Sequence, residues 1–353
     1  MAFILTSESS PSKTVARGDE VELTVGFGAA RKVARRWLRE SLLEECERRR
    51  LRVGEIVPAV EALDGSGRVR TELDEFDPPV VLVAVDTRAA IAELIDSVLA
   101  LDGDLDGSVA PVSVLFRTDE VLHELGTSPV QLTIHCRRGH TRHDPHGFAG
   151  VLDVLRCHGV AGATAIAGRE GAVAGELHRR HLLSAPDDLP AVVISVDRAD
   201  VMARVVPALL ALDQIELMTV KVVELCKARG RRWLPPAAVG DSRTLSRLTL
   251  YVGEDVIHQW RPGQASLIKR GRQAGARRVT LLRGRLGYAL GDPLRPAGGW
   301  FAYGRSPMIA IVIDTPDRAL RWFELIDDLT GHQGLLTHDF VTAISPSRLR
   351  HDP

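Results

Sequence analysis

Glycine and basic residues gather twice in this sequence, in a pattern that suits the binding of an anion. Gly168-Arg-Glu-Gly171 is followed by Gly175 and by the basic run His178-Arg-Arg-His181. Glycine lets a backbone approach an anion closely, and Arg and His side chains pair with phosphate oxygens. The alternative is a tight turn before a solvated basic loop, because Gly-x-x-Gly is common. The residues predicted to bind an anion or nucleotide are Gly168, Arg169, Gly171, Gly175, His178, Arg179, Arg180, Arg283, Gly284, Arg285 and Gly287.

A run of histidines precedes these residues and could hold a metal ion. His135, His140, His143 and His146 follow one another at short spacing, and imidazole is a common metal ligand. Arginines interleave with them, however, and no matching cluster occurs elsewhere in the chain. We therefore expect a hydrated polar loop and predict no metal site. Nor does the sequence contain a His-Glu-x-x-His or Walker motif, so no catalytic residue is assigned.

The secondary-structure elements that would position these residues belong to a sequence repeat that occurs three times. Glu22-Leu-Thr-Val25, Gln131-Leu-Thr-Ile134 and Arg247-Leu-Thr-Leu250 recur at intervals of about 110 residues, which is the signature of internal repetition. Each is followed by an apolar run that ends in aspartate, at Asp86, Asp197 and Asp314. Because a helical pattern follows each aspartate, we interpret these three residues as helix caps rather than as catalytic groups.

Each repeat reads as strand, helix, strand, strand, helix, strand. This βαββαβ order lays an antiparallel sheet under two helices, which is the ferredoxin-like arrangement of the α+β class. The third strand of each repeat is apolar on successive residues, so the second sheet face must also be covered. We expect the three open faces to pack on one another as an intramolecular pseudo-trimer, and the chain to be a monomer.

The predicted domain boundaries follow the repeats. The segments are an N-terminal tail (1–18), repeat 1 (19–117), a linker (118–129), repeat 2 (130–226), a linker (227–245), repeat 3 (246–345) and a C-terminal tail (346–353). Corresponding positions on the first strands hold Glu22, Gln131 and Arg247. A homotrimer could not vary these residues, and we predict that Glu22 and Arg247 approach each other near the pseudo-axis. Three unrelated exposed residues are the alternative.

The second repeat resembles the PII-like signalling family catalogued as domain of unknown function 190. The resemblance rests on Gly159-Val-Ala-Gly-Ala-Thr164, on Ala167-Gly-Arg-Glu-Gly171 and on Leu183-Ser-Ala-Pro-Asp-Asp-Leu-Pro190. The third repeat keeps Ala274-Gly-Ala276 and Arg283-Gly-Arg-Leu-Gly287. In the first, Ala59 and Ala62 stand in place of Gly168 and Gly171, so this copy is degenerate.

The resemblance implies a non-catalytic signalling protein that binds an adenine nucleotide (ATP, ADP or AMP) or another small anion between neighbouring units. It also implies a link to fluoride or ion homeostasis, with a membrane transporter or fluoride channel as partner. A degenerate scaffold that only docks on such a membrane protein is one alternative. An enzyme acting on a small anionic substrate is another, because fold alone does not fix chemistry.

Composition narrows the classes of function. Lys and Arg (45) nearly balance Asp and Glu (46), so no overall field draws this chain to nucleic acid, and none is expected as a partner. The four cysteines are widely spaced and form no disulfide or zinc pattern, which fits the cytoplasm. No export signal or membrane-spanning segment is predicted, because the longest apolar runs have strand length.

Overall fold

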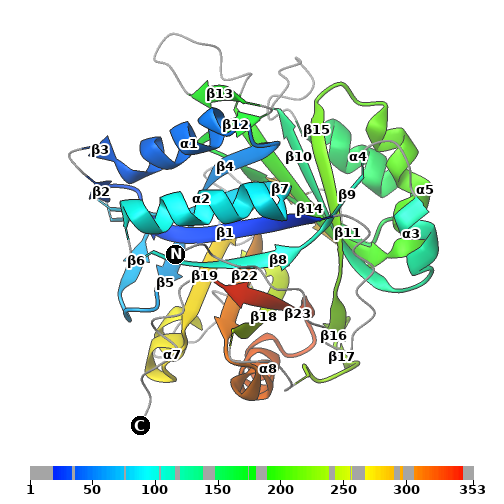
Figure 1. Cartoon of the computed structure of the whole chain (residues 1–353). Helices are drawn as coiled ribbons and strands as arrows, with labels where there is room; N and C mark the ends of the chain where they lie inside the picture. Colours follow the sequence, from blue (N-terminus) through cyan, green and yellow to red (C-terminus); the bar gives the residue numbers. More distant parts are fainter. Residues whose placement is uncertain are drawn as a thin grey trace.

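The computed structural model describes residues 19–33, 36–74, 77–102, 105–115, 120–137, 148–173, 175–179, 189–237, 243–254, 256, 267–289, 295–296 and 306–344. Within them the chain is a mixed α+β protein, built mainly from antiparallel sheets with a small number of helices (Figure 1). The α+β class predicted from the sequence is confirmed. We call residues 19–117, 130–226 and 246–345 the first, second and third copies.

The first copy begins with a long strand and carries two helices. Helix α2 forms because Ile91, Leu94, Ile95 and Val98 recur at three- and four-residue steps and are all buried. The elements are β1 (Glu20–Gly28), β2 (Lys32–Val33), β3 (Arg36–Trp37), α1 (Leu38–Arg48), β4 (Val53–Pro58), β5 (Glu61–Leu63), β6 (Val69–Thr71), β7 (Pro79–Thr87), α2 (Arg88–Leu101), β8 (Asp106–Pro111) and β9 (Ser113–Val114).

The predicted linker 118–129 contains a short helix that sequence patterning did not identify, α3 (Glu120–Leu125). The second copy comprises β10 (Pro129–Arg137), α4 (Ala149–Cys157), β11 (Gly162–Ala167), β12 (Glu170–Val173), β13 (Glu176–Arg179), β14 (Pro190–Arg198), α5 (Ala199–Leu210), β15 (Ile215–Val222) and β16 (Glu224–Ala228). Strand β16 continues into the predicted linker 227–245, which also contains β17 (Arg231–Arg232). The third copy comprises β18 (Thr244–Gly253), α7 (Leu267–Gln273), β19 (Arg278–Arg283), β20 (Leu286–Ala289), β21 (Arg295–Pro296), β22 (Pro307–Asp314), α8 (Pro316–Thr330) and β23 (Leu335–Ala343).

One order of strands occurs in all three copies. It runs β4-β7-β1-β8 in the first, β11-β14-β10-β15 in the second and β19-β22-β18-β23 in the third. A short strand that lies between the second and third of these strands in the sequence of each copy pairs with a strand of another copy. Strand β5 pairs with β19 of the third copy, β12 with β4 of the first, and β20 with β11 of the second. Each copy therefore extends a hairpin, which we call its arm, onto another copy in cyclic order. The arms are β5–β6, β12–β13 and β20–β21.

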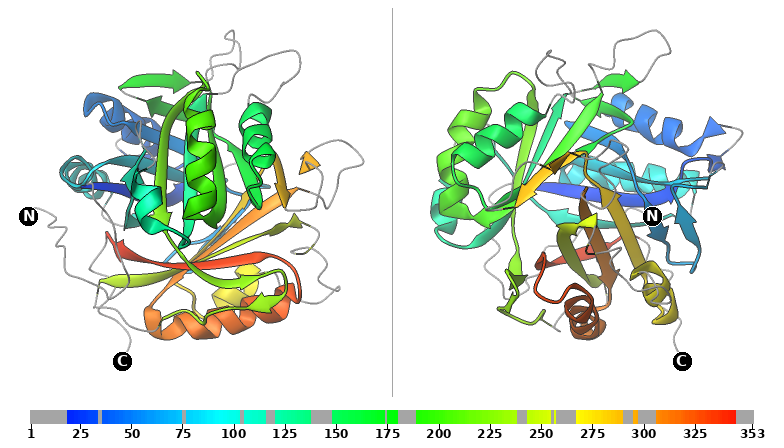
Figure 2. Two further views of the ribbon diagram at one scale, coloured as in Figure 1. Left: turned by 90° about the vertical axis from the view of Figure 1, so that its right-hand side faces the viewer. Right: turned by 180° about the vertical axis from the view of Figure 1, so that it is seen from behind.

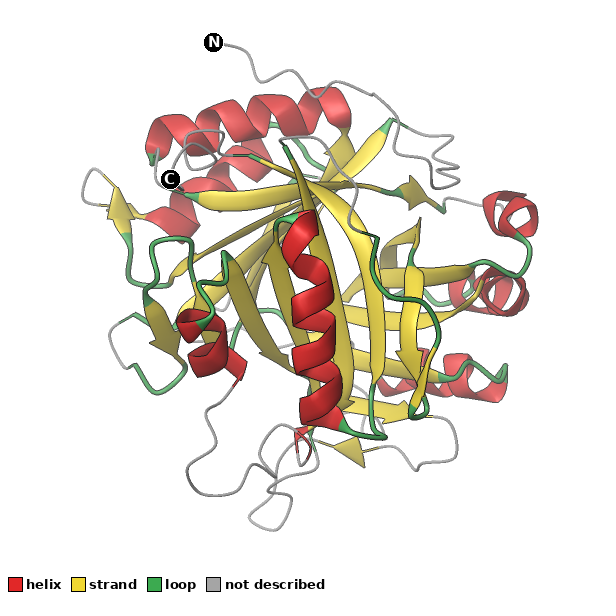
Figure 3. Ribbon diagram, turned by 90° about the horizontal axis from the view of Figure 1, so that it is seen from below, coloured by secondary structure: helices red, strands yellow, loops and turns green. Residues whose placement is uncertain are grey.

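The helices lie on the outside and the strands inside, as two further views show (Figure 2), and the view from below agrees (Figure 3). Three buried clusters each fill the space between one copy's helices and its sheet. Each cluster also takes in an apolar residue of a borrowed arm, namely Ala172 in the first copy, Leu286 in the second and Leu63 in the third. The arms are thus part of the cores that they join.

Strands of all three copies meet in a further apolar cluster at the centre. Apart from Ala59, its buried members come in corresponding sets, Val57, Ile166 and Leu282 from the second strands and Val81, Val192 and Ile309 from the third strands. The second face of each sheet is therefore covered by the other copies, as the uninterrupted apolar character of the third strands indicates.

The predicted approach of Glu22 and Arg247 is confirmed. Arg247 Nη1 donates to Glu22 Oε1 at 3.4 Å, and both residues are buried. Arg247 Nε also donates to Asp339 Oδ1 at 2.9 Å, and Lys221 Nζ lies 3.2 Å from Asp339 Oδ2. All three copies thus contribute to one buried ionic network beside the apolar cluster.

The aspartates that end the third strands have a structural role, as expected, but the helix-capping prediction is wrong in detail. The N-cap residues are Thr87, Arg198 and Thr315, each one position later. Asp86 instead accepts the amide of Arg52 at 2.9 Å, and Asp197 accepts that of Ala161 at 2.8 Å. Since both amides lie just before the second strand of the copy, the carboxylates fix where that strand begins.

Candidate ligand-binding cleft

The predicted glycines of the second copy lie where its arm leaves the sheet. The amide of Gly168 donates to the carbonyl of Pro190 at 2.9 Å, and that of Arg169 donates to the carbonyl of Ile56 at 2.9 Å. A Cβ atom at Gly168 would lie 2.7 Å from Pro190 Cγ. Gly175 forms the β12–β13 turn with φ of 84°, where glycine is favoured. The amide of Arg169 and the turn at Gly175, which lies against Arg50, therefore serve the contact with the first copy, whereas Gly168 packs on Pro190 of its own copy.

The other predicted binding residues of the second copy lie on the arm or beyond the described residues. Gly171 lies on β12, where a Cβ atom would be 3.0 Å from Pro190 Cγ. His178 is partly buried on β13, opposite Gly171. Only the backbone of Arg179 is described, and Arg180 lies outside the described residues.

The third copy repeats this arrangement against the second. The amide of Gly284 donates to the carbonyl of Pro307 at 2.8 Å, and that of Arg285 donates to Ala165 at 2.7 Å. A Cβ atom at Gly287 would lie 2.8 Å from the carbonyl oxygen of Ala163. Close approach of two backbones therefore accounts for the recurring glycines.

Arg283 is engaged by two carboxylates. Its Nη1 donates to Glu72 Oε1 at 2.7 Å, and its Nη2 donates to Glu254 Oε1 at 3.0 Å. Arg169 and Arg285, in contrast, are exposed. The structure places the two predicted sets on different arms, each against a different neighbouring copy, so it does not assemble them into one site. Anion binding by these residues stays a prediction.

The histidine run is only partly described. His140, His143 and His146 lie outside the described residues, whereas His135 lies on β10 and is fully buried. His135 Nδ1 is 3.1 Å from Glu55 Oε2 of the first copy. In the part of the chain that the structure describes, no three His, Cys, Asp or Glu side chains gather as a metal site.

The pKa of His135 is raised. Burial by itself would lower the pKa of the imidazole, but the charge and hydrogen bond of Glu55, with Glu22 beyond it, outweigh burial. A raised folded-state pKa stabilises the protein below the unfolded value of about 6.5, and this stabilisation is lost as pH rises through the folded value. The His135–Glu55 pair therefore links the first and second copies most strongly in mildly acidic solution.

We predict that the free energy of unfolding falls from pH 6 towards pH 9, as His135 loses its proton. The H135Q variant should lose this component of the pH dependence. Urea denaturation at a series of pH values measures the slope. His158 is exposed, so H158Q is the matched control and should follow the wild-type curve. Equal slopes in H135Q and wild type would contradict the assignment.

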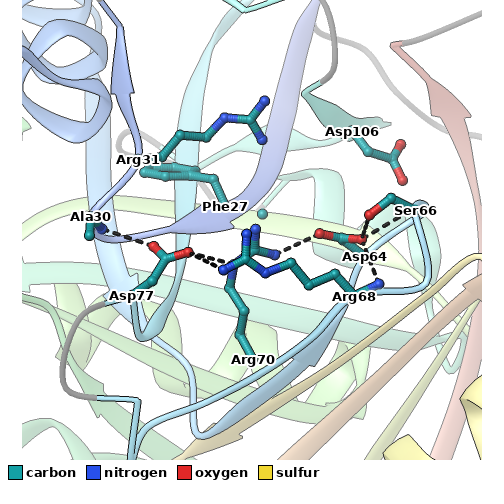
Figure 4. Close-up of a pocket in the computed structure, with 10 residues that line it drawn as sticks. Phe27, Ala30, Arg31, Asp64, Ser66, Arg68, Arg70, Asp77 and Asp106 are labelled. Carbon is teal, nitrogen blue, oxygen red and sulfur yellow. Dashed lines mark hydrogen bonds and ion pairs between the residues drawn. The ribbon is translucent and has the colours of Figure 1, made fainter. Parts of the chain in front are cut away.

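A cleft of about 530 Å³ opens in the first copy (Figure 4). Its walls come from the end of β1, from the following turn, from the β5–β6 hairpin and from the start of β8. The lining residues are Gly26, Phe27, Ala30, Arg31, Asp64, Ser66, Arg68, Arg70, Asp77 and Asp106. All ten belong to the first copy; because β5 is paired with β19 of the third copy, the cleft lies in the first copy beside its junction with the third. Its size is typical of a small-molecule site.

The β5–β6 turn is held by Asp64. Its Oδ1 accepts the amides of Ser66 at 3.0 Å and of Arg68 at 3.2 Å. Gly67, with φ of 80°, supplies the left-handed residue of the turn. Burial would raise the pKa of Asp64, but the hydrogen bonds from Ser66 and Arg70 lower it overall. The turn therefore presents an ionised carboxylate and the side chain of Arg68 to the cleft.

Arg70 ties the hairpin to the floor of the cleft. Its Nη1 donates to Asp64 Oδ2 at 2.6 Å, and its Nε donates to Asp77 Oδ2 at 3.0 Å. Asp77 Oδ1 in turn accepts the amide of Ala30 at 3.0 Å. Figure 4 shows Arg70 between the two aspartates. Since Arg70 is buried and bonded to two carboxylates, it organises the cleft rather than reaching into solvent.

Two arginines keep part of their guanidinium groups accessible. The side chain of Arg68 is 56% exposed and contacts Asp77 Oδ2 at 3.1 Å. The side chain of Arg31 is 30% exposed and pairs with Asp102. Both line the cleft, and each guanidinium has five N–H donors. An anionic group that enters the cleft would therefore meet two cations that already have fixed positions.

The junction between the first and third copies differs from the other two in the residues that fill it. Counted from Leu23, Leu132 and Leu248, corresponding positions on the first strands hold Gly26, His135 and Tyr251. The residues opposite them on the last strands are Asp106, Leu217 and Leu335. A Cβ atom at Gly26 would meet nothing within 4 Å. Large side chains thus fill two junctions, while a glycine and a carboxylate leave the third open and polar.

The comparisons with known proteins agree with the repeated strands. The family of domain of unknown function 190, described as "Uncharacterized ACR", matches residues 129–225 and 245–343, together more than half of the chain. The chain belongs to this family. It carries two recognised tandem copies of the domain of unknown function 190, and the cleft lies before both of them, in the diverged first copy.

Other comparisons add little. No curated protein matches the sequence. Among solved structures, the chain is similar to the structure of chlorite dismutase from Candidatus Nitrospira defluvii in complex with imidazole, at 10% identity. That likeness covers 58% of this chain and 92% of the other, with a TM-score of 0.18, which is too low to support an argument about fold or function.

The cleft was not predicted from the sequence, because the predicted site residues were the glycines and basic residues of the second and third copies, and the cleft lies in the first. Two signals could have identified it. The segment Asp64-Gly-Ser-Gly-Arg68 combines an Asx-type turn with charge. Gly26 also stands at the position where the other copies have His135 and Tyr251. Neither signal resembles the pattern of the family, so the first copy reads from its sequence as degenerate.

Proposed function

We propose that this member of the domain of unknown function 190 family is a PII-like regulatory protein that binds a nucleotide or similar small anion in the cleft of its first copy, beside the junction with the third. The observation that carries the proposal is the cleft of about 530 Å³ lined by Arg31 and Arg68. Its volume accommodates a ligand of nucleotide size, and its accessible cations suit a phosphate group.

The body of the protein, in this proposal, is an intramolecular pseudo-trimer of three ferredoxin-like units. Support comes from the strand order common to the copies, from the cyclic exchange of arms and from the central cluster to which all three contribute. One chain then supplies the clefts between units that a homotrimer would otherwise make. Light scattering should give the mass of a monomer, and a strict homotrimer would contradict this arrangement.

The proposed site also fits a regulatory role better than a catalytic one. All three arginines of the cleft contact aspartates, so positive and negative charges alternate around it. Such a site orients a ligand that has both an anionic group and hydrogen-bond donors. The β5–β6 hairpin that forms one wall is at the same time bonded to the third copy. A ligand that contacts Arg68 would therefore affect the position of this hairpin, and with it the pairing of β5 with β19.

Calorimetry on the full chain against ATP, ADP, AMP, cyclic nucleotides and GMP tests the proposal. We predict saturable binding of at least one nucleotide, and roughly ten- to a hundredfold weaker binding by R68A, since a hydrogen bond to a charged group contributes about 1.5–3 kcal/mol. Arg198 is a matched control, because its side chain is 55% exposed and paired with Asp200 in the second copy; R198A should bind like wild type.

Variants of the second- and third-copy arms distinguish the two anion-binding hypotheses. If R169A and R285A weaken nucleotide binding while R68A does not, the ligand binds at the arms and the cleft is not the site. If neither any of these nucleotides nor fluoride binds, the hypothesis that the protein senses a small ligand is wrong. A scaffold that docks on a membrane transporter or fluoride channel would then be the better proposal.

The described residues contain no helix that is both long and apolar enough to cross a membrane.

A further inference from the structure

The inner end of the cleft carries a buried carboxylate with unused hydrogen-bonding capacity. Asp106 is 5% exposed, and it faces the cleft beside the β5–β6 turn (Figure 4). Arg278 Nη2 of the third copy lies 2.9 Å from Asp106 Oδ1 in an ion pair. Neither carboxylate oxygen of Asp106, however, has a hydrogen-bond partner of acceptable geometry in the described protein.

A buried donor stands next to these two acceptors. Arg278 is 6% exposed, and its Nη1 has no hydrogen-bond partner among the described residues. Ser108, two positions along β8 from Asp106 and on the same face, has an unpartnered hydroxyl as well. Buried polar groups without partners are costly. The cluster is therefore suited to a ligand that supplies the complementary groups.

There is room for such a ligand because position 26 is glycine. Gly26 is paired directly with Asp106 on the neighbouring strand, so the two residues face the same side of the sheet. Gly26 lines both the cleft and a smaller central cavity of about 80 Å³, which Arg278 also lines. His135 and Tyr251 occupy the corresponding positions in the other copies. Asp106 lines the cleft and Arg278 lines the central cavity, so their ion pair lies between the two spaces, with Gly26 beside both. We call the space at Gly26 beside this pair the recess.

We propose that this recess is a nucleobase subsite that selects guanine. The inference rests on the proposed function, because it assigns the base of a nucleotide whose phosphate is held by Arg31 and Arg68. Guanine presents one acceptor, O6, beside two donors, N1–H and the N2 amino group. Arg278 and Asp106 offer the complementary groups, namely the unpartnered Nη1 donor of Arg278 and the two carboxylate oxygens of Asp106, held together by the ion pair of Nη2 with Oδ1.

Adenine does not complement this set. Its edge offers one donor and one acceptor, so one oxygen of Asp106 would remain buried without a partner. Sites built to hydrogen-bond a group discriminate strongly against analogues that lack it. Hypoxanthine keeps O6 and N1–H and lacks only the amino group, so it leaves a single contact unmade. The structure therefore favours a guanine nucleotide over the adenine nucleotides that the resemblance to PII-like proteins implies.

Calorimetric titration of the full chain with GMP, IMP and AMP tests the subsite. GMP should bind most tightly. IMP should bind roughly tenfold more weakly, and AMP roughly ten- to a hundredfold more weakly, as expected for the loss of one or more base contacts. Equal affinity for GMP and AMP, with R68A weakening both, would overturn the guanine subsite and leave the proposed function standing. No binding of any of these nucleotides overturns both proposals.

The variant D106N separates recognition of the base from a structural role. Asparagine replaces one acceptor by a donor, so D106N should bind GMP roughly ten- to a hundredfold more weakly. Xanthine has a carbonyl where guanine has the N2 amino group, and it complements that change. XMP should therefore bind D106N more tightly than GMP does. Loss of GMP binding without a gain for XMP would overturn the role of Asp106 in reading the base.

A second variant tests the recess without touching the charged pair. G26L fills the space beside Asp106, where a Cβ atom meets nothing within 4 Å, and should abolish the preference for GMP over AMP. Gly150, on helix α4, also has open space around it, so G150A is the control and should bind like wild type. Unchanged selectivity in a folded G26L protein would overturn the subsite.

Discussion

Replacing Arg247 with methionine should lower the free energy of unfolding by about 3–5 kcal/mol, the cost typical of breaking a buried ion pair by removing one partner. Arg247 is 6% exposed, and it bonds Asp339 within its own copy and Glu22 of the first copy. Without its guanidinium, Glu22 loses this cation, and Asp339 keeps only Lys221. The loss is large because the remaining carboxylates stay buried.

The titration of Asp339 supports this reasoning. Burial would raise the pKa of this carboxyl group, but Arg247 and Lys221 outweigh burial and hold the pKa at about 2. A depressed folded-state pKa stabilises the protein above the unfolded value of about 3.9, and the stabilisation is lost as pH falls towards 2. R247M should therefore also unfold at higher pH than wild type during acid titration.

Arg232 provides a matched control for R247M. It also pairs with two carboxylates of the third copy, Glu324 and Asp327, but its side chain is 49% exposed. Exposed ion pairs contribute about 0–1 kcal/mol, so R232M should change stability much less. Urea denaturation followed by far-UV circular dichroism measures both variants. A loss for R247M no greater than that for R232M would show that the central network does not hold the copies together.

The I309A variant should cost about 2–5 kcal/mol, as truncation of a buried apolar side chain does. Ile309 is 1% exposed and packs in the central cluster with Val57 and Val81 of the first copy and Ile166 and Val192 of the second. The cavity left by the truncation would be bounded by side chains of all three copies. We therefore expect a lower melting temperature for the whole chain rather than for the third copy alone.

Leu320 is the control for this truncation. It lies on helix α8 of the same copy, and it is 48% exposed, so L320A removes a similar volume without opening a core cavity. Differential scanning calorimetry of both variants reports the size of the loss and the number of transitions. If I309A melts the third copy separately while the rest keeps its wild-type transition, the central cluster does not couple the copies.

Much of the body of this protein could be predicted from the sequence. Leu23, Leu132 and Leu248 recur in equivalent strands because each repeat must bury the same face under its helices. Apolar residues at successive positions in the third strands indicated that the second face is covered too. The charges of Glu22 and Arg247 indicated the contact between copies, because opposite charges at equivalent strand positions meet where the open faces meet.

Other roles depended on contacts that no single stretch of sequence shows. Gly168 and Gly284 look like an anion-binding pattern, but their amides bond Pro190 and Pro307, far along the chain. The aspartates at the ends of the third strands look like helix caps, but Asp86 and Asp197 accept amides before the second strands. Propensity describes neighbours in sequence, whereas these bonds join segments that only folding brings together.

By itself, then, the sequence determined the repeated α+β units and the meeting of Glu22 with Arg247. Only the tertiary structure decided where a ligand could bind. The cleft combines Arg31, Asp64, Arg68 and Asp106 from three separate parts of the first copy, and Arg278 of the third copy pairs with Asp106. Its opening depends on Gly26 having no side chain at a position that the other copies fill. Such an absence gains meaning only when the three copies are packed together.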